Sequence, residues 1–195
     1  MNVNPWVTIW LQPRATIRDA INSAKTPLAL MIFLIVVTGC IETVTNFMSE
    51  GDRPLSLVML IVVIILSSLI SLGGWFIIAG LIGMIGRGLG GNGSNEDIRI
   101  AVALAMIPTF VSAIFTLLAL ITYKIGQVEL EMMLAFVGMF FSIWAIFTYV
   151  KSIAEAHRFS AWLSLATLLL MLLVLSLIFI VIYFIFGAAI VALFG

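Results

Sequence analysis

Long runs of apolar residues, separated by short polar segments, dominate the sequence. A helix needs about 20 apolar residues to cross a hydrocarbon core of about 30 Å. Five runs have about this length or more, and they cover residues 28–47, 55–85, 98–123, 132–150 and 163–186. The pattern therefore predicts an all-α, polytopic membrane protein in which residues 28–195 form a bundle of five transmembrane helices.

For three of these predicted spans, the sequence does not decide whether the helix is straight, bent or broken. The spans 55–85 and 163–186 are longer than one crossing requires, and tilt, a break or continuation beyond the bilayer can absorb the excess. In the first of them, Gly73-Gly74 offers a place to bend. In the span 98–123, Pro108 removes one backbone hydrogen bond, which produces either a static kink or a functional hinge.

Residues 1–27 precede the first span and are only partly apolar. Trp6 and Trp10 are four residues apart, so a helix places both rings on one face, and such rings favour the headgroup zone. After Pro13, apolar residues recur at helical spacing, with Arg14 and Arg18 on the opposite side. The apolar stripe consists of Ile17, Ala20, Ile21 and Ala24. This layout predicts an in-plane amphipathic helix on the inner leaflet, either a topology anchor or a docking site for a partner.

Lysine and arginine are unevenly distributed between the two sides of the predicted bundle. Seven lie in the N-terminal segment and in the second and fourth connections: Arg14, Arg18, Lys25, Arg87, Arg99, Lys151 and Arg158. The opposite side has Arg53 and Lys124, together with the acidic residues Glu50, Asp52, Glu129 and Glu131. Because cytoplasmic loops carry the excess of positive charge, we expect a cytoplasmic N-terminus and an external C-terminus.

Composition narrows the function. The chain is 64% hydrophobic and 9% charged, with a formal net charge of zero, so nothing favours binding to nucleic acid. It has one cysteine, Cys40, and one histidine, His157, far apart in sequence, which excludes an intramolecular disulfide and argues against a metal site. It also lacks the serine-hydrolase and zinc-protease motifs. We therefore expect no catalytic residues, no enzyme activity and no cofactor.

A glycine-rich segment at 86–94 follows the second span. It contains the G-x-G-x-x-G pattern, but a dinucleotide site requires a preceding strand, and here a membrane helix precedes it. We expect instead a tight turn at the cytoplasmic surface, where Gly90, Gly91 and Gly93 permit positive φ values. Ser94 then caps the next helix, with Asp97 completing a capping box.

Polar residues within the spans are few. Glu42 is the one acidic residue inside a span, and such carboxylates are candidates for function. Fourteen residues at about 1.5 Å each place it roughly 21 Å from the inner edge, nearer the outer interface than the midplane, so a simple interfacial role is the alternative. Ser67 and Ser71 are suited to hydrogen bonds between helices. Small residues predict close helix packing on the second and fourth spans: Ala79, Gly80, Gly83, Gly86, Gly138 and Ser142.

Several pieces of the sequence, in this order, resemble the bacterial branch of the Yip family, named for its Ypt/Rab-interacting eukaryotic members. The pieces are Asn4-Pro5-Trp6, Ile9-Trp10, Pro13-Arg14-x-Thr16-Ile17-Arg18, residues 89–94, Ala105-Met106-Ile107-Pro108, Trp144, and Glu155-Ala156-His157-Arg158-Phe159-Ser160-Ala161-Trp162. The resemblance implies a five-span domain with the orientation given above, located in the bacterial cytoplasmic membrane.

The eukaryotic relatives act in vesicle trafficking through Rab GTPases, usually with a long cytosolic N-terminal region. This chain has only 27 residues before the first span and lacks an Asp-Leu-Tyr-Gly type motif. We therefore do not expect a Rab-type GTPase as its partner. For the bacterial members, the resemblance implies a fold and no particular activity.

Two functions fit these features. The first is a non-enzymatic membrane adaptor or accessory protein that binds other membrane proteins, such as a transporter complex or a stress or trafficking-type system, or a second copy of itself. Its candidate interaction residues are Gly90, Gly91, Gly93, Ser94, Pro108, Glu155 and Ser160. The alternative is a lipid- or small-solute-handling protein, a scramblase or transporter, with a groove lined by Glu42, Ser67, Ser71 and the bend at Pro108.

Overall fold

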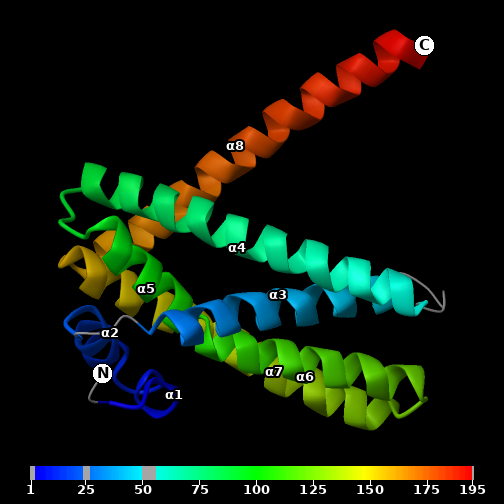
Figure 1. The fold of residues 1–195 in the computed structure, drawn as a ribbon, viewed down its shortest axis with the longest axis horizontal. Coiled ribbons are helices and arrows are strands. Elements are labelled where there is room, and N and C mark those ends of the chain that lie inside the picture. Colours follow the sequence, from blue (N-terminus) through cyan, green and yellow to red (C-terminus); the bar gives the residue numbers. More distant parts are fainter. Residues whose placement is uncertain (1–2, 24–26, 50–55, 195) are drawn as a thin grey trace.

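A computed structural model describes residues 3–23, 27–49 and 56–194 of the chain. Within these ranges the regular structure is helical (Figure 1). The helices are α1 (Pro5–Thr8), α2 (Pro13–Ile21), α3 (Leu28–Ser49), α4 (Leu57–Gly88), α5 (Asn95–Ala105), α6 (Ile107–Lys124), α7 (Val128–His157) and α8 (Ala161–Phe194). Six residues named in the predictions above lie outside the described ranges: Ala24, Lys25, Glu50, Asp52, Arg53 and Leu55.

Five helical segments are long and apolar enough to cross a membrane, which confirms the predicted five-span, all-α fold. They are α3, α4, α5 together with α6, α7, and α8 as far as Phe186. The helices extend beyond several predicted spans. The prediction ended each span where the apolar run ends, but the polar residues that follow are still helical. Thus α7 continues from the predicted end at Val150 to His157, and α4 runs unbroken through Gly73-Gly74.

Pro108 divides the third span in two. Helix α5 ends at Ala105 and α6 begins at Ile107, with the proline in its first turn. A proline has no N–H to donate to the preceding turn, so the hydrogen-bond ladder is interrupted there. Around the break, the Met106 amide bonds to the Ala103 carbonyl oxygen at 3.2 Å. At the predicted kink, one helix therefore ends and another begins. That this break acts as a functional hinge stays a prediction.

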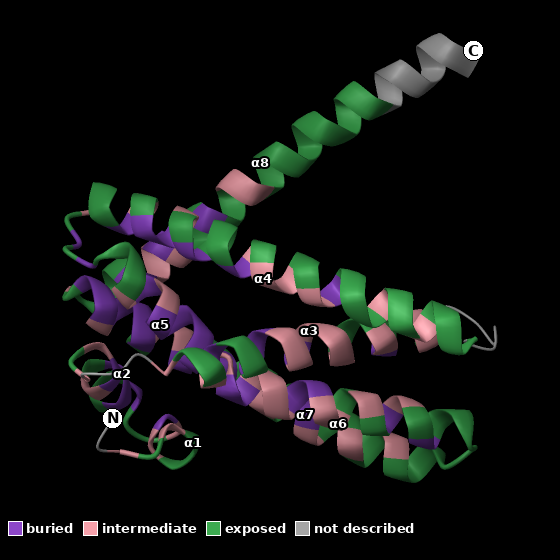
Figure 2. Cartoon of the chain, in the orientation of Figure 1, coloured by how far each residue is buried: buried purple, intermediate pink, exposed green. Residues whose placement is uncertain are grey.

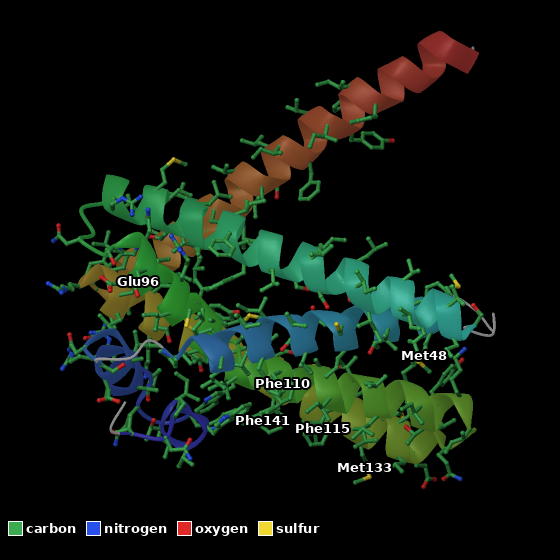
Figure 3. The ribbon with its side chains drawn as sticks, in the orientation of Figure 1. Met48, Glu96, Phe110, Phe115, Met133 and Phe141 are labelled. Atoms are coloured by element: carbon green, nitrogen blue, oxygen red, sulfur yellow. The ribbon has the colours of Figure 1, made fainter. Side chains whose placement is uncertain are left out.

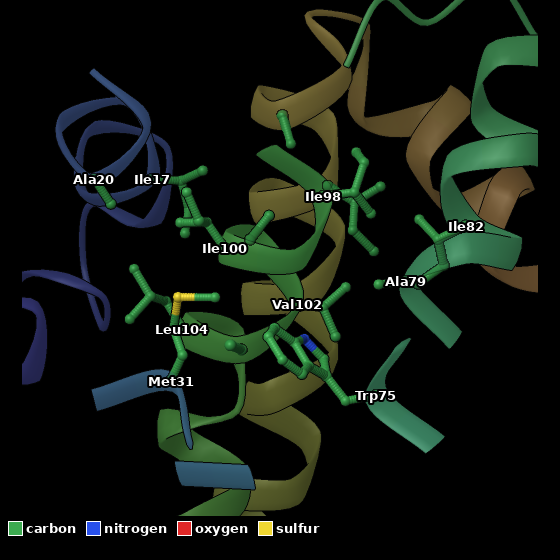
Figure 4. Packing of buried hydrophobic residues seen from close by; sticks show 14 of the residues in the cluster. Ile17, Ala20, Met31, Trp75, Ala79, Ile82, Ile98, Ile100, Val102 and Leu104 are labelled. Carbon is green, nitrogen blue, oxygen red and sulfur yellow. The ribbon is translucent and has the colours of Figure 1, made fainter. Parts of the chain in front are cut away.

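The apolar core lies at the end of the molecule where α2, α5 and the end of α7 meet (Figure 2). Every residue of α5 from Ile100 to Ala105 is buried, and the span made of α5 and α6 has the largest buried share of the five. Figure 4 shows Ile98, Val102 and Leu104 of α5 facing residues of α2, α3 and α4. The centre of the fold is thus the short helix that follows the glycine-rich turn.

Helix α8 begins against α4 and α7 and then leaves the bundle (Figure 1). Its first turns contain the buried residues Ser164, Thr167 and Met171. By contrast, every residue from Leu177 to Phe186 is exposed. Because α8 diverges from α4, the first half of α8 forms one wall of a cavity.

Candidate functional site

The glycine-rich turn between α4 and α5 wraps around His157, the last residue of α7. The His157 side chain is 0% exposed, and its carbonyl oxygen accepts a hydrogen bond from the Asn92 amide at 3.0 Å. A Cβ atom added to Gly91 would lie 2.5 Å from His157 Nδ1, and one added to Gly93 would lie 2.6 Å from the Ala156 carbonyl oxygen. Close approach therefore requires glycine at both positions, and the turn joins α4 and α5 to the end of α7.

The structure confirms the positive φ at one of the three glycines and the capping box. Gly90 has a φ of +92°, whereas Gly91 and Gly93 do not have a positive φ. The Ser94 hydroxyl accepts a hydrogen bond from the Asp97 amide at 3.0 Å, and the Asp97 carboxylate accepts one from the Ser94 amide at 3.0 Å, which is a complete capping box. The Ser160 hydroxyl has a similar structural role at the start of α8, where it accepts from the Leu163 amide at 3.3 Å.

The N-terminal helices pack on the bundle through aromatic and apolar contacts. The Trp6 ring lies 5.8 Å from the Phe110 ring, and the Trp10 ring 5.4 Å from the Phe141 ring, measured between centroids. Figure 3 shows Phe110 and Phe141 on the side of the bundle that faces α1. The Trp144 indole N–H donates to the Trp10 carbonyl oxygen at 3.2 Å. The predicted apolar stripe of α2 faces α5 and α7, since both Ile17 and Ala20 are buried there. Its place in the headgroup zone stays a prediction, as does the anchoring role of the exposed Arg14.

The structure brings Arg18 of α2 and Glu155 of α7 into an ion pair, with 2.6 Å between Nε and Oε1. The Arg18 side chain is 65% exposed, so water screens this pair. The hydrogen bond and the charge of Glu155 raise the pKa of Arg18. The ordinary pKa of arginine is already far above neutral pH, and here it is raised. The Arg18 side chain therefore stays positively charged at every pH near neutrality.

Helices α3 and α4 approach each other closely at two of the predicted polar positions. The hydroxyl of Ser67 lies 3.3 Å from Cys40 Sγ and donates to the Ile64 carbonyl oxygen at 3.1 Å. One turn further along α4, a Cβ atom on Gly39 would overlap the Ser71 side chain. These contacts assign Ser67 to the interface between α3 and α4.

A cavity of about 630 Å³, which we call the lateral groove, lies between α3, α4, α5, α7 and α8. Its walls are mostly apolar, with Ile78 of α4 and Leu168 and Leu172 of α8 among them. Ile78 and Leu172 are exposed in the described part of the chain, so the groove is open toward the surroundings of the bundle. The polar side chains that line it, apart from the indole of Trp75, are Glu42, Ser71 and Tyr149.

A second cavity of about 290 Å³, the polar pocket, lies beside the lateral groove between α3, α6 and α7. Apart from Ala113, its lining consists of polar residues: Glu42, Thr45, Asn46, Thr109, Ser112, Thr116 and Ser142. Two of these lie where α6 and α7 approach closely: the Ser112 hydroxyl is 2.8 Å from the Gly138 carbonyl oxygen and 2.7 Å from the Ser142 hydroxyl. Close packing was predicted at Gly138 and Ser142, without a partner helix.

Glu42 is the residue that the lateral groove and the polar pocket share. The Tyr149 hydroxyl, from the groove, is hydrogen-bonded to Thr109, from the pocket, and lies within electrostatic range of Glu42. Of the residues that the alternative function places in a groove, Glu42 and Ser71 line the lateral groove, whereas Ser67 and Pro108 are not among its lining residues. Sequence reasoning missed Tyr149, because an isolated tyrosine in an apolar helix carries no distinctive signal.

Comparison with protein families identifies a multi-pass membrane protein of a known class. The Yip1 domain matches residues 7–193, so nearly the whole chain corresponds to this one domain. The protein belongs to the Yip1 domain family, whose members are generally non-catalytic membrane proteins. No curated protein and no solved structure matches the sequence.

Proposed function

We propose that this Yip1-domain protein is a non-enzymatic lipid-binding protein of the bacterial cytoplasmic membrane, and that the lateral groove is its binding site. The observation that carries this proposal is the cavity of about 630 Å³, apolar along its walls and carrying one carboxylate, Glu42. Small-molecule sites typically have volumes of about 300–1,000 Å³ and combine apolar walls with a few polar groups.

Physical reasoning favours an amphipathic occupant. An apolar cavity is not filled by water, and an empty one forfeits the dispersion contacts of its lining. A hydrocarbon chain beside Ile78, Leu168 and Leu172 supplies those contacts. At the same time, a charged side chain on a membrane helix costs about 2.5–3.5 kcal/mol at the centre of a span and less toward the interface, where Glu42 is expected, so Glu42 favours a polar or oppositely charged partner. A lipid meets both requirements, since its acyl chains contact the apolar walls and its polar headgroup lies near Glu42.

A matched pair of glycines in α4 provides the test. Gly74 lines the groove and Gly73 does not, and a Cβ atom at either position meets nothing within 4 Å. We expect Gly74→Phe to fill the groove and Gly73→Phe to leave it open. Native mass spectrometry of the purified protein in mild detergent should show a retained lipid in the wild type and in Gly73→Phe, and its loss in Gly74→Phe. Equal lipid retention by the two variants would contradict the proposal.

The adaptor function predicted from sequence has one observation in its favour, the exposed second half of α8. A transmembrane helix is normally held at its tilt by packing against neighbours, and residues 177–186 of α8 are all exposed. A helix of another membrane protein is the partner that this surface fits. Affinity purification from gently solubilised native membranes separates the two functions: a stoichiometric protein partner that is lost when residues 177–186 are replaced by a poly-leucine helix supports the adaptor.

A further inference from the structure

The chemistry of the polar pocket restricts the kind of headgroup that it can hold. Three of its hydroxyl groups already donate their hydrogen atom to the protein. Thr45 donates to the Ile41 carbonyl oxygen at 2.7 Å, and Thr116 donates to the Ser112 carbonyl oxygen at 3.0 Å. A hydroxyl that has donated its hydrogen keeps lone pairs and can only accept. These side chains therefore offer acceptors to a ligand.

The third hydroxyl is that of Ser112, which lies in donating position 2.8 Å from the Gly138 carbonyl oxygen. Thr109 interacts with Tyr149, which lines the lateral groove. The amide of Asn46 adds a carbonyl acceptor together with its N–H donors, and Glu42 adds two carboxylate oxygens. The pocket is thus rich in acceptors and poor in donors.

The charge of the two cavities has one sign. Among the described residues that line the lateral groove and the polar pocket, none is a lysine, an arginine or a histidine, and Glu42 is the only acidic one. A headgroup whose only charged group is a phosphate or a carboxylate would meet a like charge and few hydrogen-bond donors. A cation that donates several hydrogen bonds meets both an opposite charge and a set of acceptors.

We propose that the polar pocket binds the primary ammonium group of an aminophospholipid, with Glu42 as its counter-charge and the acyl chains of the same lipid in the lateral groove. This inference rests on the proposed function and adds the class of headgroup. A primary ammonium has three N–H donors for the pocket's acceptors, whereas a trimethylammonium group has none. The site therefore prefers an ethanolamine headgroup to a choline headgroup, and either of them to an anionic glycerol headgroup.

The test compares phosphatidylethanolamine, phosphatidylcholine and phosphatidylglycerol with identical acyl chains, titrated against the delipidated full chain in detergent and followed by native mass spectrometry. We expect wild-type protein to prefer phosphatidylethanolamine at least tenfold over each of the others. Glu42→Gln, which keeps the size of the side chain and removes its charge, should reduce that preference to threefold or less while lipid still binds. Glu129→Gln, which removes an exposed carboxylate outside both cavities, should keep the wild-type preference.

The outcomes distinguish the two proposals. Lipid binding without a headgroup preference, or a preference unchanged in Glu42→Gln, would overturn the ammonium site and leave the lipid-binding function standing. No lipid binding by the wild type would overturn both. Free ethanolamine carries the same primary ammonium group without acyl chains. If it binds as tightly as phosphatidylethanolamine, the role proposed for the acyl chains is overturned.

Discussion

His157 connects three segments of the chain through one buried side chain. Its Nε2 lies 3.3 Å from the Ile82 carbonyl oxygen of α4, its ring centroid lies 4.9 Å from that of Phe159, and Gly86 and Gly91 lie against its ring. Among the described polar atoms, its Nδ1 is buried without a hydrogen-bond partner. The imidazole therefore acts mainly through its shape, as the object around which the glycine-rich turn closes.

The first prediction concerns Gly91. The Cβ of Gly91→Ala would lie 2.5 Å from His157 Nδ1 and 2.8 Å from the Gly86 carbonyl oxygen, and neither backbone nor ring can move away cheaply. Overpacking of this kind costs about 1–3 kcal/mol. We expect a clearly lower midpoint of thermal unfolding in detergent. Gly88→Ala is the control, since its Cβ meets nothing within 4 Å, and an equal loss in both variants would contradict the role given to His157.

The sequence predicts the local features of this turn and misses its centre. The capping box of Ser94 with Asp97, and the positive φ of Gly90, depend on residues close together in the chain, so spacing alone reveals them. The packing of Gly91 on His157 depends on how α4 and α7 are arranged, which no local pattern encodes. Likewise, the depth of Glu42 follows from helix geometry, whereas its neighbours Thr109 and Tyr149 come from other helices.

At the scale of single helices, α2 shows how one amphipathic pattern fits two environments. An apolar stripe opposite basic residues suits both a membrane surface and a protein surface, and here it is buried on α5 and α7. The reason lies in the partner surface, because α5 carries apolar residues such as Ile100 where α2 packs (Figure 4). The sequence predicts the apolar stripe, but it does not show whether the stripe packs on the membrane or on other helices.

The second prediction separates burial from charge in the docking of α2. Ile17 is 0% exposed, and truncating such a residue to alanine usually costs about 2–5 kcal/mol. We therefore expect Ile17→Ala to accelerate amide hydrogen exchange throughout α2. Arg18→Gln removes only the exposed partner of an ion pair and should change the exchange little, with any difference from wild type vanishing at high salt. A larger effect for Arg18→Gln than for Ile17→Ala would show that charge holds α2.

At the scale of the whole molecule, the basic segments that are separate in sequence come together at one end. Arg18 pairs with Glu155, and Arg87 donates to Asn95 at 2.9 Å beside the glycine-rich turn. Figure 1 shows α2, the turn after α4 and the end of α7 at this end, and the connection between α6 and α7 at the other. The order of the helices and their alternation across the membrane are predictable from the apolar runs. The departure of α8 from the bundle is not, since its sequence is apolar on all sides apart from a few serine and threonine residues.

The third prediction concerns the orientation of this charged end. Seven of nine basic residues belong to segments on that side, and positive charge is retained in the cytoplasm during insertion. In a Cys40→Ala background, a membrane-impermeant maleimide applied to intact cells should label Gln127→Cys in the connection between α6 and α7. It should label Asn92→Cys in the glycine-rich turn only after the membrane is opened. Both side chains are exposed, so access to the reagent decides the result. Labelling of Asn92→Cys alone would reverse the orientation, and that reversal would also move Glu42 toward the cytoplasmic leaflet and change which leaflet supplies the lipid.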